Sequence, residues 1–225
     1  RLLANTATAA CGIIIAIATL MRWRMHASAQ LKVIISGGFS APYQQLLPEF
    51  ERKSGNKVTT GSGASQGTGP QTIGAQLARD VAADVVILSR EGLSELIAAN
   101  RIAVGTDVDL AQVPLGVAVR AGAARPDVST VEAFKRTLTN AKAVAMPGST
   151  SGIYLMNDLF PRLGIAEKVN VKVAARGTGV VAMVAAGDAD LAVMPVSEIL
   201  NAAGVDFTGT IPVEIQLVQV FAAAM

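Results

Sequence analysis

The chain has 225 residues, of which 51% are hydrophobic and 16% are charged, so it can bury a full core and is not intrinsically disordered. Its single histidine, His26, and its single cysteine, Cys11, both precede residue 30, which excludes Ser-His-Asp and Cys-His catalysis, zinc sites of His and Cys, and disulfides from the rest. After residue 29 the chain carries 16 basic and 17 acidic side chains, and this near-neutral balance argues against nucleic acid as a partner.

The N-terminal segment is typical of an export leader. Residues 11–21, CGIIIAIATLM, form an apolar run, and the small residues at 27–29 (Ala-Ser-Ala) match a signal-peptidase site. We therefore interpret residues 1–29 as a signal peptide and expect a periplasmic protein. A transmembrane anchor is the alternative, because residues 2–21 are long enough to span a bilayer.

Beyond the leader, short apolar runs alternate with stretches of helical periodicity. Several runs, VIIS and VVIL among them, are continuously apolar, which is typical of parallel strands covered by helices on both faces. The predicted strands are 31–36, 56–60, 84–88, 115–120, 141–146, 169–174, 190–194 and 211–223, and the predicted helices are 42–53, 70–79, 91–99, 131–139, 153–163, 180–186 and 197–203.

This order predicts an α/β fold with mostly parallel sheets flanked by helices. The alternation of apolar runs and helical stretches is interrupted near residues 107–114 and then begins again. We therefore expect one lobe over 31–112, a second over 113–195, and a cleft between them. Residues 196–225 form a return segment. Because its apolar run stops at the last residue without a closing helix, we expect the C-terminal end to be truncated.

One local design occurs four times: an apolar run ends in a loop rich in glycine and hydroxyl residues that precedes a helix. A helix N-terminus carries unpaired N–H groups and a partial positive charge, and glycine lets a ligand approach the backbone closely. Such loops lie at the carboxyl ends of parallel strands, where ligands bind. The four loops are 36–42, 61–69, 147–152 and 176–179.

We interpret these loops as cradles for a small anion. Arg176 is the one cation among them and is a candidate partner for a ligand carboxylate. Phe39 is either an apolar wall of the cleft or a core residue. We find no catalytic residue, metal site or cofactor motif. The candidate ligand-binding residues from the loops are Gly38, Phe39, Ser40, Ser65, Gln66, Ser151, Gly152, Arg176, Gly177 and Thr178.

Five stretches carry a family resemblance: LKVIISGGFSAPYQQLLPEFERKSGNKV, GSGAS, ARDVAADVVILS, PGSTSGIYLMNDLFPRLGI and VVAMVAAGDADLAVMPVSEI. Together they resemble the periplasmic solute-binding proteins of ABC transporters, most of all the molybdate-binding subfamily of the type II fold. The resemblance covers residues 31–221. It implies two lobes that close on a ligand, and a membrane permease as partner.

The resemblance also implies ligand positions. The family's two ligand serines correspond to Gly38, with Ser40 nearby, and to Ser65. Backbone amides are implied at Ser151 and about Gly177, and the family's ligand tyrosine corresponds to Pro195. Because two side-chain donors are absent and Arg176 lies beside Gly177 in the fourth loop, we expect the ligand to be either a molybdate-like oxyanion or a small organic carboxylate.

We therefore expect a monomeric, non-enzymatic solute-binding component of an ABC importer that holds a small anion between two lobes. Two other functions use the same fold. The first is an enzyme, which would need an acid or base placed in the cleft. The second is the ligand-sensing effector domain of a regulator.

Overall fold

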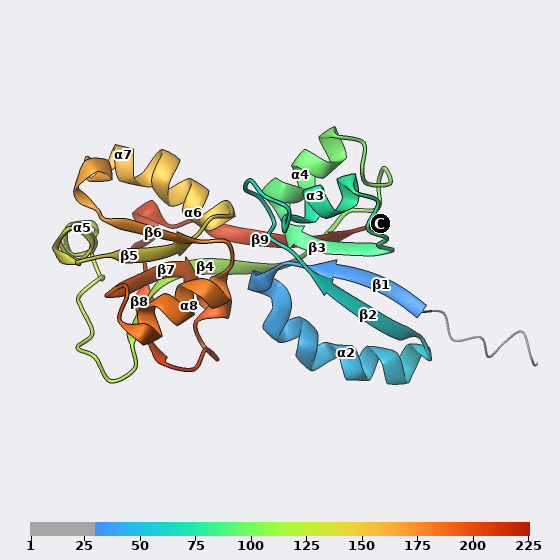
Figure 1. The fold of residues 1–225 in the computed structure, drawn as a ribbon, viewed down its shortest axis with the longest axis horizontal. Helices are drawn as coiled ribbons and strands as arrows, with labels where there is room; N and C mark the ends of the chain where they lie inside the picture. The colour runs from blue at the N-terminus through green and yellow to red at the C-terminus, as the bar shows by residue number, and fades with distance from the viewer. Residues whose placement is uncertain (1–29) are drawn as a thin grey trace, which may run out of the picture.

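The computed structural model describes residues 30–225, and the predicted leader lies outside the described residues. Lobe 1 is built on three parallel strands, with α2 on one face of the sheet and α3 and α4 on the other (Figure 1). Its elements are β1 (Gln30–Ile35), the short helix Gly37–Phe39, α2 (Ser40–Ser54), β2 (Lys57–Ser62), α3 (Ile73–Ala78), β3 (Val85–Ser89) and α4 (Arg90–Ala98).

Lobe 2 repeats the parallel arrangement with its own three strands and packs helices on both faces of its sheet (Figure 1). Its elements are α5 (Val131–Asn140), β5 (Val144–Pro147), α6 (Thr150–Tyr154), a π-helical turn (Leu155–Leu159), α7 (Phe160–Arg162), the short helix Ala166–Lys168, β6 (Val171–Ala174), α8 (Gly177–Ala186), β7 (Leu191–Pro195), the short helix Val196–Glu198, β8 (Val205–Thr210) and the short helix Val213–Ile215.

Two strands connect the lobes. β4 (Val108–Arg120) pairs with β9 (Val218–Ala224) at its start and with β7 and β8 further along, and β9 continues beside β3 of lobe 1. The described strands thus form one sheet in the order β2-β1-β3-β9-β4-β7-β5-β6, with β8 on β4. Every antiparallel pair involves β4 or β9, because these strands cross between the lobes.

The predicted α/β fold, with helices flanking the sheet, is confirmed, but four details differ. β8 was missed because its sequence, VDFTGT, is mostly half-buried and lacks an apolar run. Residues 197–203 form no long helix, since Ile199 is the one member of that segment to reach the core. β4 starts at Val108, inside the segment 107–114 that we expected to separate the lobes, and not at the predicted residue 115. The run 211–223 divides into a short helix and β9.

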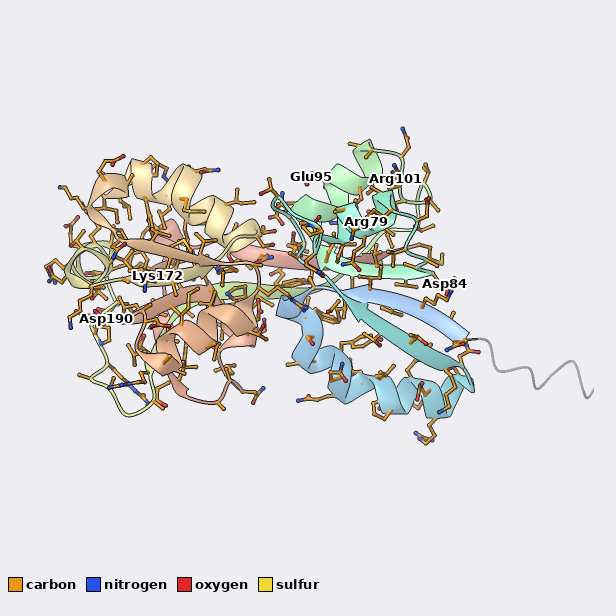
Figure 2. The ribbon with its side chains drawn as sticks, in the orientation of Figure 1. Arg79, Asp84, Glu95, Arg101, Lys172 and Asp190 are labelled. Atoms are coloured by element: carbon orange, nitrogen blue, oxygen red, sulfur yellow. The ribbon has the colours of Figure 1, made fainter. Side chains whose placement is uncertain are left out.

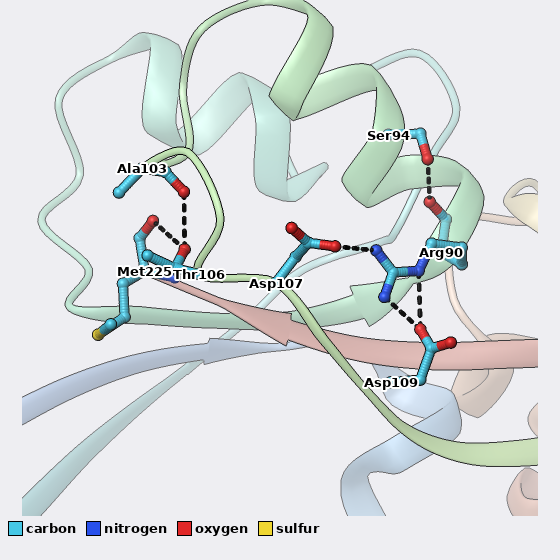
Figure 3. A network of polar contacts seen from close by, with 7 residues as sticks. All are labelled: Arg90, Ser94, Ala103, Thr106, Asp107, Asp109 and Met225. Carbon is cyan, nitrogen blue, oxygen red and sulfur yellow. Dashed lines mark hydrogen bonds and ion pairs between the residues drawn. The ribbon is translucent and has the colours of Figure 1, made fainter.

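An ion-pair network fixes the start of the crossing strand β4 to lobe 1 (Figure 3). Arg90, the first residue of α4, donates from Nη1 to Asp107 over 2.7 Å and from Nε to Asp109 over 2.8 Å. These bonds raise the pKa of Arg90, and the bond to Arg90 lowers the pKa of Asp107. Among residues 30–225, no helix is both long and apolar enough to cross a membrane.

Candidate functional site

All four glycine-rich loops meet in one chamber between the lobes. The chamber lies at the carboxyl ends of β1, β5 and β7, where an open α/β sheet binds ligands. The crossing strand β9, the end of β7 and the short helix that follows β7 supply the rest of the wall. The lining residues are Ser36, Gly37, Gly38, Gly63, Ala64, Ser65, Pro147, Ser149, Thr150, Ser151, Ala175, Arg176, Gly177, Pro195, Glu198, Gln219 and Phe221.

The chamber is closed by hydrogen bonds between the lobes. Arg176 Nη1 donates to Ser62 Oγ over 2.7 Å, and Ser197 Oγ donates to the carbonyl of Gly38 over 2.6 Å. The hydroxyls of Ser89 and Thr150 share a buried bond of 2.8 Å. The free volume of the chamber is about 30 Å³, which is room for about two water molecules. An organic acid therefore enters only when the lobes separate.

The structure brings together some of the predicted ligand-binding residues and leaves others outside. Ser40 and Thr178 line a neighbouring hollow on the outer side of Glu198. Phe39 stacks on Phe221, with ring centroids 6.3 Å apart, and also faces an apolar hollow under α2. The predicted residues that line the chamber are Gly38, Ser65, Ser151, Arg176, Gly177 and Pro195.

Two further predicted residues, Gln66 and Gly152, support the loops without lining the chamber. The backbone N–H of Gln66 donates a hydrogen bond to Ser149 Oγ of lobe 2 over 3.2 Å. Its side chain donates to Glu95, away from the chamber lining. Gly152 packs directly against the carbonyl of Pro147, so any side chain there would collide with backbone. Both residues shape the loops that line the chamber.

Ser65 belongs to a chain of hydroxyl groups that links the lobes. Its Oγ accepts the N–H of Ser89 over 2.9 Å, and the Ser89 hydroxyl meets Thr150 of lobe 2. Ser89 also caps α4 by accepting the N–H of Gly92. Because Ser65 Oγ accepts in this bond, its own proton is free to be donated to a ligand.

Glu198 is a residue of the chamber that the sequence interpretation missed. It ends the short helix after β7 and is the one carboxylic acid among the described residues that line the chamber. Gly37 and Gly177 press against its carboxylate from two sides, so a methyl group at either position would meet Glu198 Oε2. Burial raises the pKa of Glu198 to about 7, against a smaller lowering by the positive charge of Arg176.

The raised pKa predicts that Glu198 makes the fold less stable as the pH rises. The folded chain holds this proton more tightly than the unfolded chain, whose carboxyl titrates near 4.5. The free energy of unfolding therefore falls between about pH 4.5 and pH 7, by about 3 kcal/mol in total. We expect Glu198→Gln to leave the free energy of unfolding, measured by chemical denaturation, unchanged at pH 4 and to raise it at pH 8. Equal stabilities at pH 8 would contradict the raised pKa.

Two carboxylates that follow the same strand rhythm, Asp84 and Asp190, do not line the chamber. Asp84 and Asp190 sit at opposite outer ends of the molecule (Figure 2). Each accepts a backbone N–H at the start of a neighbouring strand, from Lys32 and Lys142 respectively, over 2.7 Å. These bonds therefore tie β3 to β1 and β7 to β5 at the ends of the strands away from the chamber. Within residues 30–225, no group of three or more His, Cys, Asp or Glu side chains is placed to hold a metal ion.

A wider hollow of about 670 Å³ lies at the outer end of lobe 2. Residues near the C-terminal ends of α5 and α8 line it, so the helix dipoles present their negative ends there. Its basic side chains, Arg120, Arg136 and Lys142, offset these dipoles. The hollow is broad and open, and no predicted ligand-binding residue reaches it.

The sequence carries a signal for Glu198. The segment PVSEI directly follows a buried strand, so an acid three residues beyond the strand end lies near the same edge as the glycine-rich loops. Gln219 and Phe221 gave no comparable signal, because they occupy alternate positions of an apolar strand. Only the pairing of β9 with β3 and β4 brings these two residues to the chamber.

Comparison with known proteins shows the family to which the chain belongs, a related protein, and solved structures with the same fold. Residues 31–225 match the model of the bacterial extracellular solute-binding proteins. An aconitate isomerase from Pseudomonas sp. is 37% identical over 198 residues, which are 87% of this chain and 75% of that protein.

Two solved structures share the fold. The periplasmic molybdate-binding protein of Azotobacter vinelandii aligns with a TM-score of 0.64 and 20% identity, covering 86% of this chain and 84% of that one. The LysR-family transcriptional regulator CbnR aligns with a TM-score of 0.62 and 17% identity, covering 97% of this chain and 72% of that one. These likenesses concern the fold alone, and they agree with the predicted type II architecture.

The expectation of a non-enzymatic protein is wrong. The relative of 37% identity is named as an enzyme and matches most of this chain. The expectation rested on the missing histidine and cysteine and on the failure to find an acid or base in the cleft. Glu198 is such a group, and it reaches the chamber from a short helix that looked like the start of an ordinary surface helix.

Proposed function

The chain belongs to the bacterial extracellular solute-binding proteins, and from that premise we propose that it uses their two-lobed chamber to isomerise a small unsaturated polycarboxylate, with aconitate as the substrate. The relative named aconitate isomerase supports the choice of reaction. The dipolar loops and Arg176 support an anionic substrate. The proposal places the protein outside the cytoplasm, as the name of its family describes.

The observation that carries the proposal is the position of Glu198. This carboxylate faces a chamber that N–H groups, hydroxyls and one guanidinium otherwise line. Its pKa of about 7 lets it accept a proton and return it at neutral pH. In its ionised form this carboxylate repels an anion, so storage of an anion alone does not explain its position.

The chemistry of aconitate needs one such group. Aconitate is propene-1,2,3-tricarboxylate, and its CH₂ protons are acidified by the neighbouring carboxyl group and double bond. Glu198 removes one of these protons, the electron pair spreads over the three-carbon unit, and the proton returns to the opposite carbon. The double bond thereby moves and forms again in either geometry. Atoms and electrons balance without any oxidant, reductant or metal.

The loops and Arg176 have a second task in this reaction. Removing the proton places a fourth negative charge on a tricarboxylate, and fixed N–H groups and a guanidinium stabilise that charge without reorganising. Arg176 is partly buried and lies close enough to Glu198 to lower its pKa. It is thus placed to bind a substrate carboxylate beside the base.

We expect Arg176→Ala to weaken aconitate binding by about 1.5–3 kcal/mol, the range for a hydrogen bond to a charged group. Calorimetry at neutral pH measures the effect. Arg101→Ala is the matched control, because Arg101 is exposed on the outer side of lobe 1 (Figure 2). Unchanged affinity in the Arg176 variant would remove this residue from the site.

The test of the proposed function uses the whole protein and cis-aconitate. Proton NMR in ordinary water is expected to follow the appearance of the trans isomer. In D₂O, deuterium from the solvent is expected to enter the carbon-bound positions, because the proton on Glu198 exchanges. Binding without isomerisation would overturn the enzymatic proposal, and the absence of both would overturn the choice of ligand.

A second function, delivery of a small anion to an ABC permease from the periplasm, is favoured by the family match over residues 31–225. The closed chamber and the two crossing strands suit the hinge closure that such delivery needs. The NMR experiment separates the two functions. Tight binding of aconitate, molybdate or another small anion with no turnover supports delivery.

A further inference from the structure

Two buried polar side chains in the described structure have no hydrogen-bond partner within the protein. They are Ser36 and Gln219, which are 3% and 4% exposed, and the unpaired atoms are Ser36 Oγ and Gln219 Oε1. Leaving a buried polar atom unpaired costs free energy, so native proteins keep few of them. Both of these residues line the chamber.

Ser36 and Gln219 are held by different parts of the fold from Glu198 and Arg176. Ser36 directly follows β1, and its N–H donates to the carbonyl of Ile87 over 2.8 Å. Gln219 lies in the crossing strand β9, opposite Val113 of β4. Lobe 1 and the crossing strands therefore hold Ser36 and Gln219, while lobe 2 holds the base and the guanidinium.

The chemistry of the two side chains suits a carboxylate. A serine hydroxyl donates one hydrogen bond, and a glutamine amide turned by half a rotation directs its NH₂ group to the position of its oxygen. Two neutral donors then converge on one end of the ligand. Arg176 compensates one carboxylate of a polycarboxylate by charge, so a second carboxylate needs dipolar donors of this kind.

We propose that Ser36 and Gln219 bind one carboxylate of the substrate at the crossing strands, while Arg176 binds another from lobe 2. The site thereby selects acids with at least two carboxylates. This inference rests on the proposed function, because it assigns parts of the same substrate to parts of the same chamber.

The test measures binding of three acids by calorimetry. Propane-1,2,3-tricarboxylate has the three carboxylates of aconitate but no double bond, and glutarate and methylsuccinate each lack one of its carboxylates. The variants are Ser36→Ala and Gln219→Met. The control is Gln45→Met on the exposed face of α2. We expect each site variant to weaken the tricarboxylate about tenfold or more. For one of the shorter acids, we expect wild type and variant to bind equally.

Other results overturn the inference. Variants that bind the tricarboxylate as wild type does remove Ser36 and Gln219 from the site, and equal weakening of all three acids indicates a structural role. Because each substitution removes a buried unpaired group, the melting temperature is expected not to fall, and a large fall also argues for a structural role. If wild type binds none of the acids, the proposed function fails as well. If wild type binds and only the variants' behaviour disagrees, the inference fails alone.

Discussion

Glu198→Gln is expected to lower the isomerisation of aconitate by about 10²–10⁴-fold, the range that a positioned general base contributes. Glutamine has the shape of glutamate but accepts no proton, so the chamber keeps its form while proton transfer stops. Binding of the tricarboxylate is expected to persist or tighten, because a negative charge leaves the wall. The rate of trans-aconitate formation and the dissociation constant, measured on the same sample, separate the two effects.

The pH profile and a matched control sharpen this test. Wild-type turnover is expected to rise with pH through about 7, as Glu198 loses its proton and becomes the base. Glu167→Gln, on an exposed short helix of lobe 2, is expected to keep full activity. A Glu198→Gln protein that still incorporates deuterium at the wild-type rate would exclude this residue as the base.

Gly177→Ala is expected to abolish most of the activity while Glu198 itself is retained. A methyl group at this first position of α8 would overlap Glu198 Oε2 and lie 2.8 Å from Met194 Cε. Both neighbours are the ends of flexible side chains, so the fold adapts and the carboxylate moves away. Because a small misplacement of a catalytic group costs about 10²-fold, we expect a loss of that order. Steady-state kinetics and a melting curve measure activity and folding side by side.

Gly74→Ala is the matched control for this glycine. Gly74 is the second residue of α3, outside the chamber, and an added methyl group would meet only Leu96 Cδ2 at 3.2 Å. We expect this variant to keep wild-type activity. If Gly177→Ala folds and turns over aconitate normally, the carboxylate of Glu198 does not need its observed position, and the proposed mechanism loses its geometric basis.

Much of the site could be predicted from local patterns. The loops that contain Gly38, Ser65, Ser151 and Gly177 were recognised because an apolar strand, a glycine-rich turn and a helix leave a signal within about ten residues. The same locality explains the correct prediction of an α/β fold. It also explains the missed strand β8, which is half-buried and therefore lacks a strong apolar pattern.

The alternation of strands and helices and the four loops follow from the amino-acid order, because each depends on residues that are neighbours in the chain, and the absence of histidine and cysteine after residue 29 follows from composition. That Glu198 and Gln219 line the chamber follows from long-range packing alone. Glu198 lies between glycines of two separate loops, and Gln219 reaches the chamber through the crossing of β9. Contacts between such distant residues follow from how the lobes pack and from the strand register, which a local pattern does not encode.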